Sequence, residues 1–223
     1  MRFLLQHRAP PRLAVTRLRK MPRHIGFTLF VLCLPIAVVE LVLQLADARL
    51  IGSPHWRPLT YSYAALWRGL LGNWQPNFSG QALTMFFSYA LVHTGLLHLS
   101  GNIAGLLAFA PRSGRHAGRA GLLLIAGVSS LTGALGFVLL SESVRPMIGA
   151  SGAVYGLAAA WFYWERTSRR GAALLFAGLL ALNLLQWWLI GGELAWEAHV
   201  GGMVGGWFSA KWLDTRRGQR SRR

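Results

Sequence analysis

The chain has 223 residues, of which 53% are hydrophobic and only 13% are charged. A water-soluble domain of this size needs far more charged surface, so the composition indicates that lipid is the solvent for most of the chain. The formal net charge is +16. Its basic residues lie between apolar blocks and at both ends, a pattern typical of membrane topology that argues against a nucleic-acid-binding groove. The single cysteine, Cys33, excludes an internal disulfide and is interpreted as a small apolar side chain.

Six apolar segments can be interpreted as membrane-crossing helices, although several are shorter than the ~20 residues of a perpendicular span. They occupy residues 25–46, a stretch within 83–110, and residues 121–140, 152–164, 172–190 and 198–213. The sequence therefore predicts an all-α fold, a polytopic bundle of six transmembrane helices. We expect one membrane domain at 25–213, a basic N-terminal tail at 1–24 and a basic C-terminal tail at 214–223.

The distribution of Lys and Arg predicts the orientation of these segments. Nineteen such residues lie in the N-terminal tail, in 111–120, in 165–171 and in the C-terminal stretch from Lys211. The alternate connections carry only four, namely Arg49, Arg57, Arg68 and Arg145. Under the positive-inside rule both termini are cytoplasmic, and the predicted location is the inner (cell) membrane of a bacterium. The first apolar segment is longer than the core of a signal peptide and lacks a clear cleavage site, so we expect it to remain as a helix.

Three of the predicted helices run inward from the outer surface and carry unusual polar residues near their outer ends. The second contributes His93, His98 and Asn102, the fourth begins at Ser151 and the sixth at His199. Polar side chains in a span usually face one another or a water-filled cavity. His98 and Asn102 share a helical face. His93 points about 140° away from His98, at ~100° per residue, and no carboxylate is near, so a metal site is the weaker interpretation.

The fourth segment opens with a serine between glycines, in the sequence Gly149-Ala150-Ser151-Gly152. A serine there presents its hydroxyl with little crowding, and the helix N-terminus supplies N–H donors for a developing oxyanion. Taken alone, the motif is better explained by a helix cap at Ser151 with packing glycines behind it. It is not the G-x-S-x-G elbow of soluble hydrolases.

The sixth segment combines a histidine, His199, with glycines that permit close helix packing. The same small-xxx-small spacing occurs in the fourth and sixth segments, at Gly152 and Gly156 and at Gly202 and Gly206. If these two faces meet, Ser151 and His199 come within hydrogen-bond reach, which is the minimum for an activated nucleophile. The alternative is a histidine that only satisfies a hydrogen bond inside a packed bundle.

Together these motifs resemble those of the rhomboid family of intramembrane serine proteases. The family pattern H-x4-H-x3-N is met by His93, His98 and Asn102, and the pattern G-x-S-G by Gly149 to Gly152. The pattern A-H-x2-G-x3-G is met by Ala198, His199, Gly202 and Gly206. The three motifs occur in the family order and on the expected helices.

The resemblance implies a role for each matched residue. Ser151 would be the nucleophile, His199 the general base, and His98, Asn102 and the Ser151 N–H the oxyanion hole. Tyr155 would pack on the His199 ring, Gly202 would permit close helix packing, and His93 would be structural, bonding within the first outer loop. The implied activity is cleavage of peptide bonds in or near transmembrane segments of other membrane proteins. No metal or organic cofactor, and no nucleic-acid partner, is implied.

One departure from the family pattern lies in the outer segment at 48–82 and just after it. Family members commonly carry a Trp-Arg pair nine residues before the first helix-two histidine, where this chain has Thr84 and Met85. Trp-Arg pairs occur further upstream instead, at 56–57 and 67–68.

Two rival functions make different demands on the sequence. A catalytically inactive rhomboid-like protein that binds membrane clients is expected to lack the serine or the histidine. A transporter or channel needs polar residues through the full depth of its helices, whereas the inner halves of the fourth and sixth segments are nearly all apolar. The substrate, the cleavage site, the regulation and the oligomeric state are not predicted by the sequence.

Overall fold

The computed structural model describes residues 23–165, 169–189 and 195–220. Five long helices dominate it: α1 (Arg23–Asp47), α4 (Leu96–Leu140), α5 (Ser151–Glu165), α6 (Arg169–Leu189) and α7 (Trp196–Arg220). Between α1 and α4 lie two short helices, α2 (Trp56–Ala64) and α3 (Gln81–Ser88), and two 3-10 turns, η1 (Arg68–Leu71) and η2 (Tyr89–Leu91). Within these ranges the regular structure is helical, apart from one isolated antiparallel bridge between Leu66 and Met147.

The predicted segments agree with these helices to within a few residues for α1, α5 and α6. The α7 helix, however, continues to Arg220, whereas the predicted segment ends at residue 213. Nearly all of the predicted N-terminal tail, at 1–24, lies outside the described residues. By length and composition, two stretches of the described residues could cross a membrane, Ile25–Asp47 and Leu96–Leu140.

The α4 helix contains residues 96–110 of the second predicted segment and all of the third, joined at Gly118. Residues 83–95 lie before it, in α3, η2 and the turn that follows, so His93 is not on the same helix as His98 and Asn102, contrary to the prediction. This residue has φ 69° and ψ −176°, a backbone conformation that essentially only glycine adopts. The predicted connection at 111–120 is otherwise helical, so a single glycine separates the two arms of α4. Tyr89, which precedes the first arm, donates a hydrogen bond to the carbonyl of Ser130 in the second arm, at 2.8 Å. The second arm therefore runs back toward the end where the first begins.

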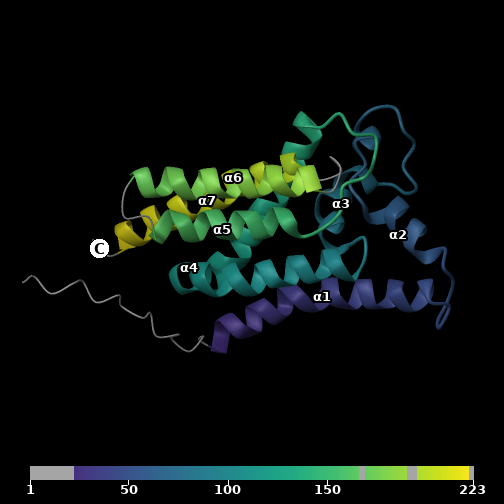
Figure 1. The fold of residues 1–223 in the computed structure, drawn as a ribbon, viewed down its shortest axis with the longest axis horizontal. Coiled ribbons are helices and arrows are strands. Elements are labelled where there is room, and N and C mark those ends of the chain that lie inside the picture. Colours follow the sequence, from purple (N-terminus) through teal and green to yellow (C-terminus); the bar gives the residue numbers. More distant parts are fainter. Residues whose placement is uncertain (1–22, 166–168, 190–194, 221–223) are drawn as a thin grey trace, which may run out of the picture.

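The core of the bundle is formed by α4, α5 and α7, with α1 packed against α4 (Figure 1). Glycines allow α5 and α7 to approach at backbone distance. A Cβ added to Gly202 would lie 2.2 Å from the carbonyl oxygen of Gly152, and one added to Gly206 would lie 2.0 Å from that of Gly156. The two glycine faces expected to meet therefore do meet. The α6 helix lies at the edge, against α5 and α7.

Large apolar side chains cover the outward face of α1. They are exposed in the described chain, and they include Phe27, Phe30, Leu34, Val38 and Leu41. A contiguous apolar face of this kind is typical of a surface that contacts lipid.

The segment between α1 and α4 gathers at one end of the bundle, where α2 and α3 lie (Figure 1). Met85 of α3 is fully buried and packs in a cluster with Leu66, Tyr89 and Met147. This segment adjoins the ends of the helices that carry the polar motifs.

Candidate active site

Ser151 and His199 form the centre of the site. Ser151 is the first residue of α5 and is partly exposed, whereas His199 lies in the first turn of α7 with 3% of its surface exposed. The Nε2 atom of His199 is 2.8 Å from the Oγ atom of Ser151, a hydrogen-bond distance. The close glycine packing of α5 and α7 positions both side chains at the same end of the bundle.

The turn before Ser151 depends on Gly149. Its φ of 112° belongs to a region that L-residues rarely adopt. The Gly149 N–H donates to the carbonyl of Tyr89 at 3.0 Å, which attaches the turn to the segment between α1 and α4. The carbonyl of Ala150 then accepts from the N–H of Val154 at 3.2 Å, so α5 begins directly at Ser151. The serine therefore sits at a helix N-terminus, where the first N–H groups point along the helix axis and out of it.

Tyr155 lies one turn after Ser151 and stacks on the His199 ring. The two ring centroids are 4.2 Å apart and the planes differ by 10°. Such a stack restricts rotation of the imidazole and keeps Nε2 directed at the serine. The predicted packing of Tyr155 on His199 is thus present in the structure.

His98 and Asn102 lie on the first arm of α4, beside the Gly149 turn. A Cβ added to Gly149 would be 2.7 Å from both Cε1 and Nε2 of His98, and 3.8 Å from Nδ2 of Asn102. Nδ2 of Asn102 donates to the His98 carbonyl at 3.0 Å, while its buried Oδ1 has no hydrogen-bond partner among the described residues. The structure therefore brings both predicted side chains to the turn that leads into Ser151.

His93 is fully buried, and its ring packs edge-on against that of His98 with centroids 5.0 Å apart. Its backbone carbonyl accepts hydrogen bonds from Arg57 and Tyr61 of α2. His93 is thus bonded to α2 through its backbone carbonyl and not through its side chain. The structural role of His93 stays a prediction.

Sequence reasoning missed a charged network beside the site. Glu40 is fully buried in α1 and pairs with Arg57, whose Nη2 is 2.9 Å from its Oε1. The signal was present in the sequence, because a carboxylate within an apolar span is costly and usually has a partner. Among the described residues, no group of three or more His, Cys, Asp and Glu side chains is placed to hold a metal ion.

Comparison with models of protein families identifies the family of the chain. The family model described as the rhomboid domain matches residues 80–216, more than half of the chain. This chain belongs to the rhomboid family. Its match includes every motif residue from His93 to Gly206, and membership makes it an integral membrane protein.

Curated rhomboid relatives are bacterial. The chain is 30% identical over 197 residues to the rhomboid protease GlpG of Yersinia enterocolitica, and the match covers 85% of this chain and 63% of that protein. The same values hold for the rhomboid protease GlpG of Serratia proteamaculans. The rhomboid protease GluP of Bacillus subtilis is 27% identical over 127 residues, which is 54% of this chain and 24% of that protein. The chain thus spans less than two thirds of the length of these two GlpG proteins.

Proposed function

We propose that this rhomboid is an intramembrane serine endopeptidase. It hydrolyses peptide bonds in or near transmembrane segments of other membrane proteins, using Ser151 as nucleophile and His199 as general base. The observation that carries the proposal is the 2.8 Å contact between Nε2 of His199 and Oγ of Ser151, at a helix N-terminus. The names of the curated relatives, which are rhomboid proteases, support the same activity.

The proposed reaction begins when His199 Nε2 removes the proton of the Ser151 hydroxyl. Oγ attacks the carbonyl carbon of the substrate, and a C–O bond forms as the carbonyl becomes an oxyanion. The C–N bond then breaks, and His199 returns the proton to the leaving amine. Water hydrolyses the acyl-enzyme with His199 again as base, so the site must be reached by water. Stacking on Tyr155 orients the imidazole for this reaction.

The proposed oxyanion hole consists of the Ser151 N–H with the side chains of His98 and Asn102. Support comes from the position of both side chains against the Gly149 turn, next to the nucleophile. Hydrogen bonds to a developing negative charge are strong in a site that excludes most water. The chemistry needs no metal or organic cofactor.

We further propose six membrane-crossing helices in one domain at 25–213, with basic cytoplasmic tails at 1–24 and 214–223. The two arms of α4 would supply two of the six, and α1, α5, α6 and α7 the others. The site would then lie toward the outer surface of the bacterial cell membrane, where water has access. The bias of Lys and Arg between alternate connections supports this orientation.

The test is cleavage of a reporter membrane protein by the purified chain in liposomes. We expect Ser151→Ala and His199→Ala each to abolish cleavage while circular dichroism and thermal unfolding stay as in the native protein. The matched controls are Ser100→Ala and His55→Ala, which change exposed residues near the same end and should cleave normally. A fluorophosphonate probe should label the native protein and His55→Ala, but not Ser151→Ala.

Two outcomes would contradict the proposal. Unchanged cleavage by Ser151→Ala would remove that residue as nucleophile. Absence of both cleavage and probe labelling in the native chain, across several reporters, would favour a protein that binds membrane clients without cutting them.

A further inference from the structure

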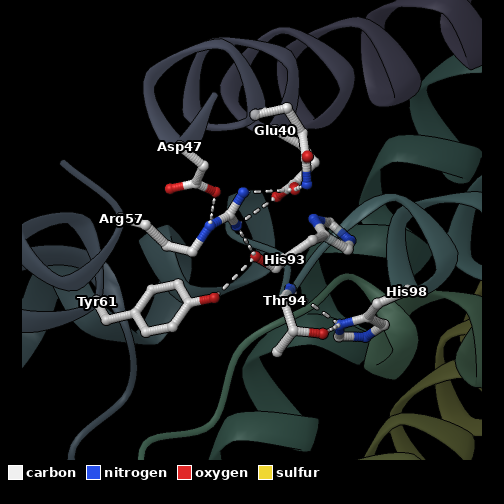
Figure 2. A network of polar contacts seen from close by, with 8 residues as sticks. Glu40, Asp47, Arg57, Tyr61, His93, Thr94 and His98 are labelled. Atoms are coloured by element: carbon white, nitrogen blue, oxygen red, sulfur yellow. Dashed lines mark hydrogen bonds and ion pairs between the residues drawn. The ribbon is translucent and has the colours of Figure 1, made fainter. Parts of the chain in front are cut away.

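A buried ion pair joins the first membrane helix to the outer segment. Both carboxylate oxygens of Glu40 accept from Arg57, at 2.9 Å from Nη2 and 3.1 Å from Nη1. Oε1 also accepts from Nε2 of Gln44 at 2.8 Å. Arg57 reaches a second carboxylate, because its Nε is 2.6 Å from Oδ2 of Asp47. The guanidinium is thus held in one orientation by two acids of the same helix (Figure 2).

The guanidinium of Arg57 stays protonated in this environment. Burial alone lowers its pKa, but the hydrogen bonds to Glu40, Asp47 and Tyr61 outweigh this effect, and the net result is a raised pKa. A paired carboxylate inside an apolar span is expensive to maintain, so such pairs usually mark a functional element.

The fixed guanidinium is directed at one peptide group. Nη1 of Arg57 donates to the carbonyl oxygen of His93 at 3.1 Å, and the Tyr61 hydroxyl donates to the same oxygen at 3.2 Å. The N–H of that peptide belongs to Thr94. Because a trans peptide is planar, with C=O and N–H pointing in opposite directions, anchoring the carbonyl also sets the direction of the Thr94 N–H.

The Thr94 N–H points at the ring of His98. Its nitrogen is 3.4 Å from Nδ1 of His98, and the Thr94 hydroxyl oxygen is 3.3 Å from the same atom. Figure 2 shows the arrangement, with Arg57 and Tyr61 on one side of the peptide and His98 on the other. A backbone N–H can only donate, so this contact favours the tautomer in which Nδ1 accepts, and the Thr94 hydroxyl can donate to the same atom. The proton of the neutral imidazole is then on Nε2, the atom beside the Gly149 turn.

We infer that Glu40 and Arg57 form a positioning pair that acts through the peptide between His93 and Thr94, and sets both the orientation and the tautomer of His98. The pair acts on His98 through this peptide and has no direct part in the proposed chemistry of Ser151. It presents the Nε2–H of His98 to the oxyanion, and this part of the inference rests on the proposed function. Gly95, with φ 149°, completes the tight turn between Thr94 and the start of α4.

The first test measures the tautomer, which needs no protease activity. Histidine labelled with nitrogen-15 is incorporated into the full chain in detergent micelles, and the His98 resonances are assigned by their loss in His98→Ala. We expect native His98 to carry its proton on Nε2. In the double variant E40Q/R57Q, which removes both charges and so leaves no unpaired buried ion, both tautomers should be populated. A native ring with its proton on Nδ1, or a double variant with the native tautomer, would overturn the inference.

The second test is kinetic and asks whether the pair acts through His98. We expect E40Q/R57Q to lower kcat by about 10- to 100-fold, the range for losing a hydrogen bond from a charged group, with KM changed less than about twofold. The same double variant in a His98→Ala background should cause almost no further loss, because the group being positioned is gone. The matched control is Arg49→Gln, an exposed arginine of the same outer segment, which should leave kcat unchanged.

Tyr61→Phe provides a milder variant that buries no unpaired charge. It removes one of the two donors to the His93 carbonyl and should lower kcat by about 2- to 10-fold, again only when His98 is present. Equal losses with and without His98 would show a merely structural pair and contradict the inference, as would an unchanged kcat in E40Q/R57Q. If the native chain cleaves no reporter, the proposed function fails, and the tautomer measurement alone decides the positioning of His98.

Discussion

At the scale of single residues, Asn102 separates two interpretations of the site. It is buried, its Nδ2 bonds to the His98 carbonyl, and its Oδ1 has no hydrogen-bond partner among the described residues. The unpaired Oδ1 costs about 1–3 kcal/mol and cannot itself stabilise an oxyanion, because an amide oxygen only accepts. Nδ2 carries two N–H groups and gives one to the His98 carbonyl, so the other is the donor available to a transient oxyanion.

If Asn102 is an oxyanion donor, Asn102→Ala should lower kcat by about 10²-fold or more, with KM nearly unchanged. The reason is that the bond is made to charge present only in the transition state. Steady-state cleavage of the reporter in liposomes measures both constants. Asn102→Ala with native kcat and a lowered thermal stability would make the residue structural. Ser100→Ala, two residues earlier on α4 and exposed, is the control.

At the scale of helices, the contact between α5 and α7 decides the geometry of Ser151 and His199. The two backbones approach so closely that Gly202 has no room for a methyl group beside the Gly152 carbonyl. Any increase in that separation moves the serine and the histidine apart, because each lies within a turn of the contact.

Gly202→Ala should therefore reduce cleavage and stability together. A Cβ would lie 2.2 Å from the Gly152 oxygen, and forced overpacking typically costs about 1–3 kcal/mol. Gly127→Ala is the matched control, since a Cβ there meets no atom within 4 Å. Thermal unfolding in detergent and reporter cleavage measure the two effects. Native activity in Gly202→Ala would show that the helices can separate without disturbing the site.

The Gly118 kink explains why one boundary in α4 could not be predicted. Basic residues at 111–120 indicated a connection between two spans, and the two arms of α4 do meet within this stretch, at Gly118. The sequence does not reveal how few residues a reversal needs, because the turn depends on one glycine at φ 69° and ψ −176°. Positive φ is a property of the backbone in its tertiary context, and any of several glycines nearby could have supplied it.

At the scale of the whole molecule, the site residues that could be predicted lie on long regular helices, and those that could not be predicted include one in an irregular segment. Ser151 and His199 could be proposed as a pair from sequence because each stands beside a repeated glycine spacing, which brings them together if the two glycine faces meet, and because both match motifs of one family. Arg57 and Glu40 could not be paired in this way. Arg57 belongs to an outer segment of short helices and turns, where no periodic pattern predicts which side chain reaches a neighbouring helix.

Orientation in the membrane is the remaining property that concerns the entire chain, and it determines which side the site faces. The outer segment between α1 and α4 lies at the end that carries Ser151, whereas the last turns of α7 extend to the opposite end. If the positive-inside rule holds here, the two ends face different compartments. Cys33 is the only cysteine, so Cys33→Ser gives a background free of thiols.

In that background, Asn73→Cys in the outer segment and Gln219→Cys near the end of α7 report on the two ends, and both positions are exposed. A membrane-impermeant maleimide added to intact cells should label Asn73→Cys at once, because the proposed orientation places the segment between α1 and α4 outside the cytoplasm. Gln219→Cys should react only after the membrane is permeabilised. The reverse pattern would place Ser151 on the cytoplasmic side and contradict the proposed orientation. Labelling of both in intact cells would place the two ends in the same compartment, which a bundle crossing the membrane from one end to the other does not permit.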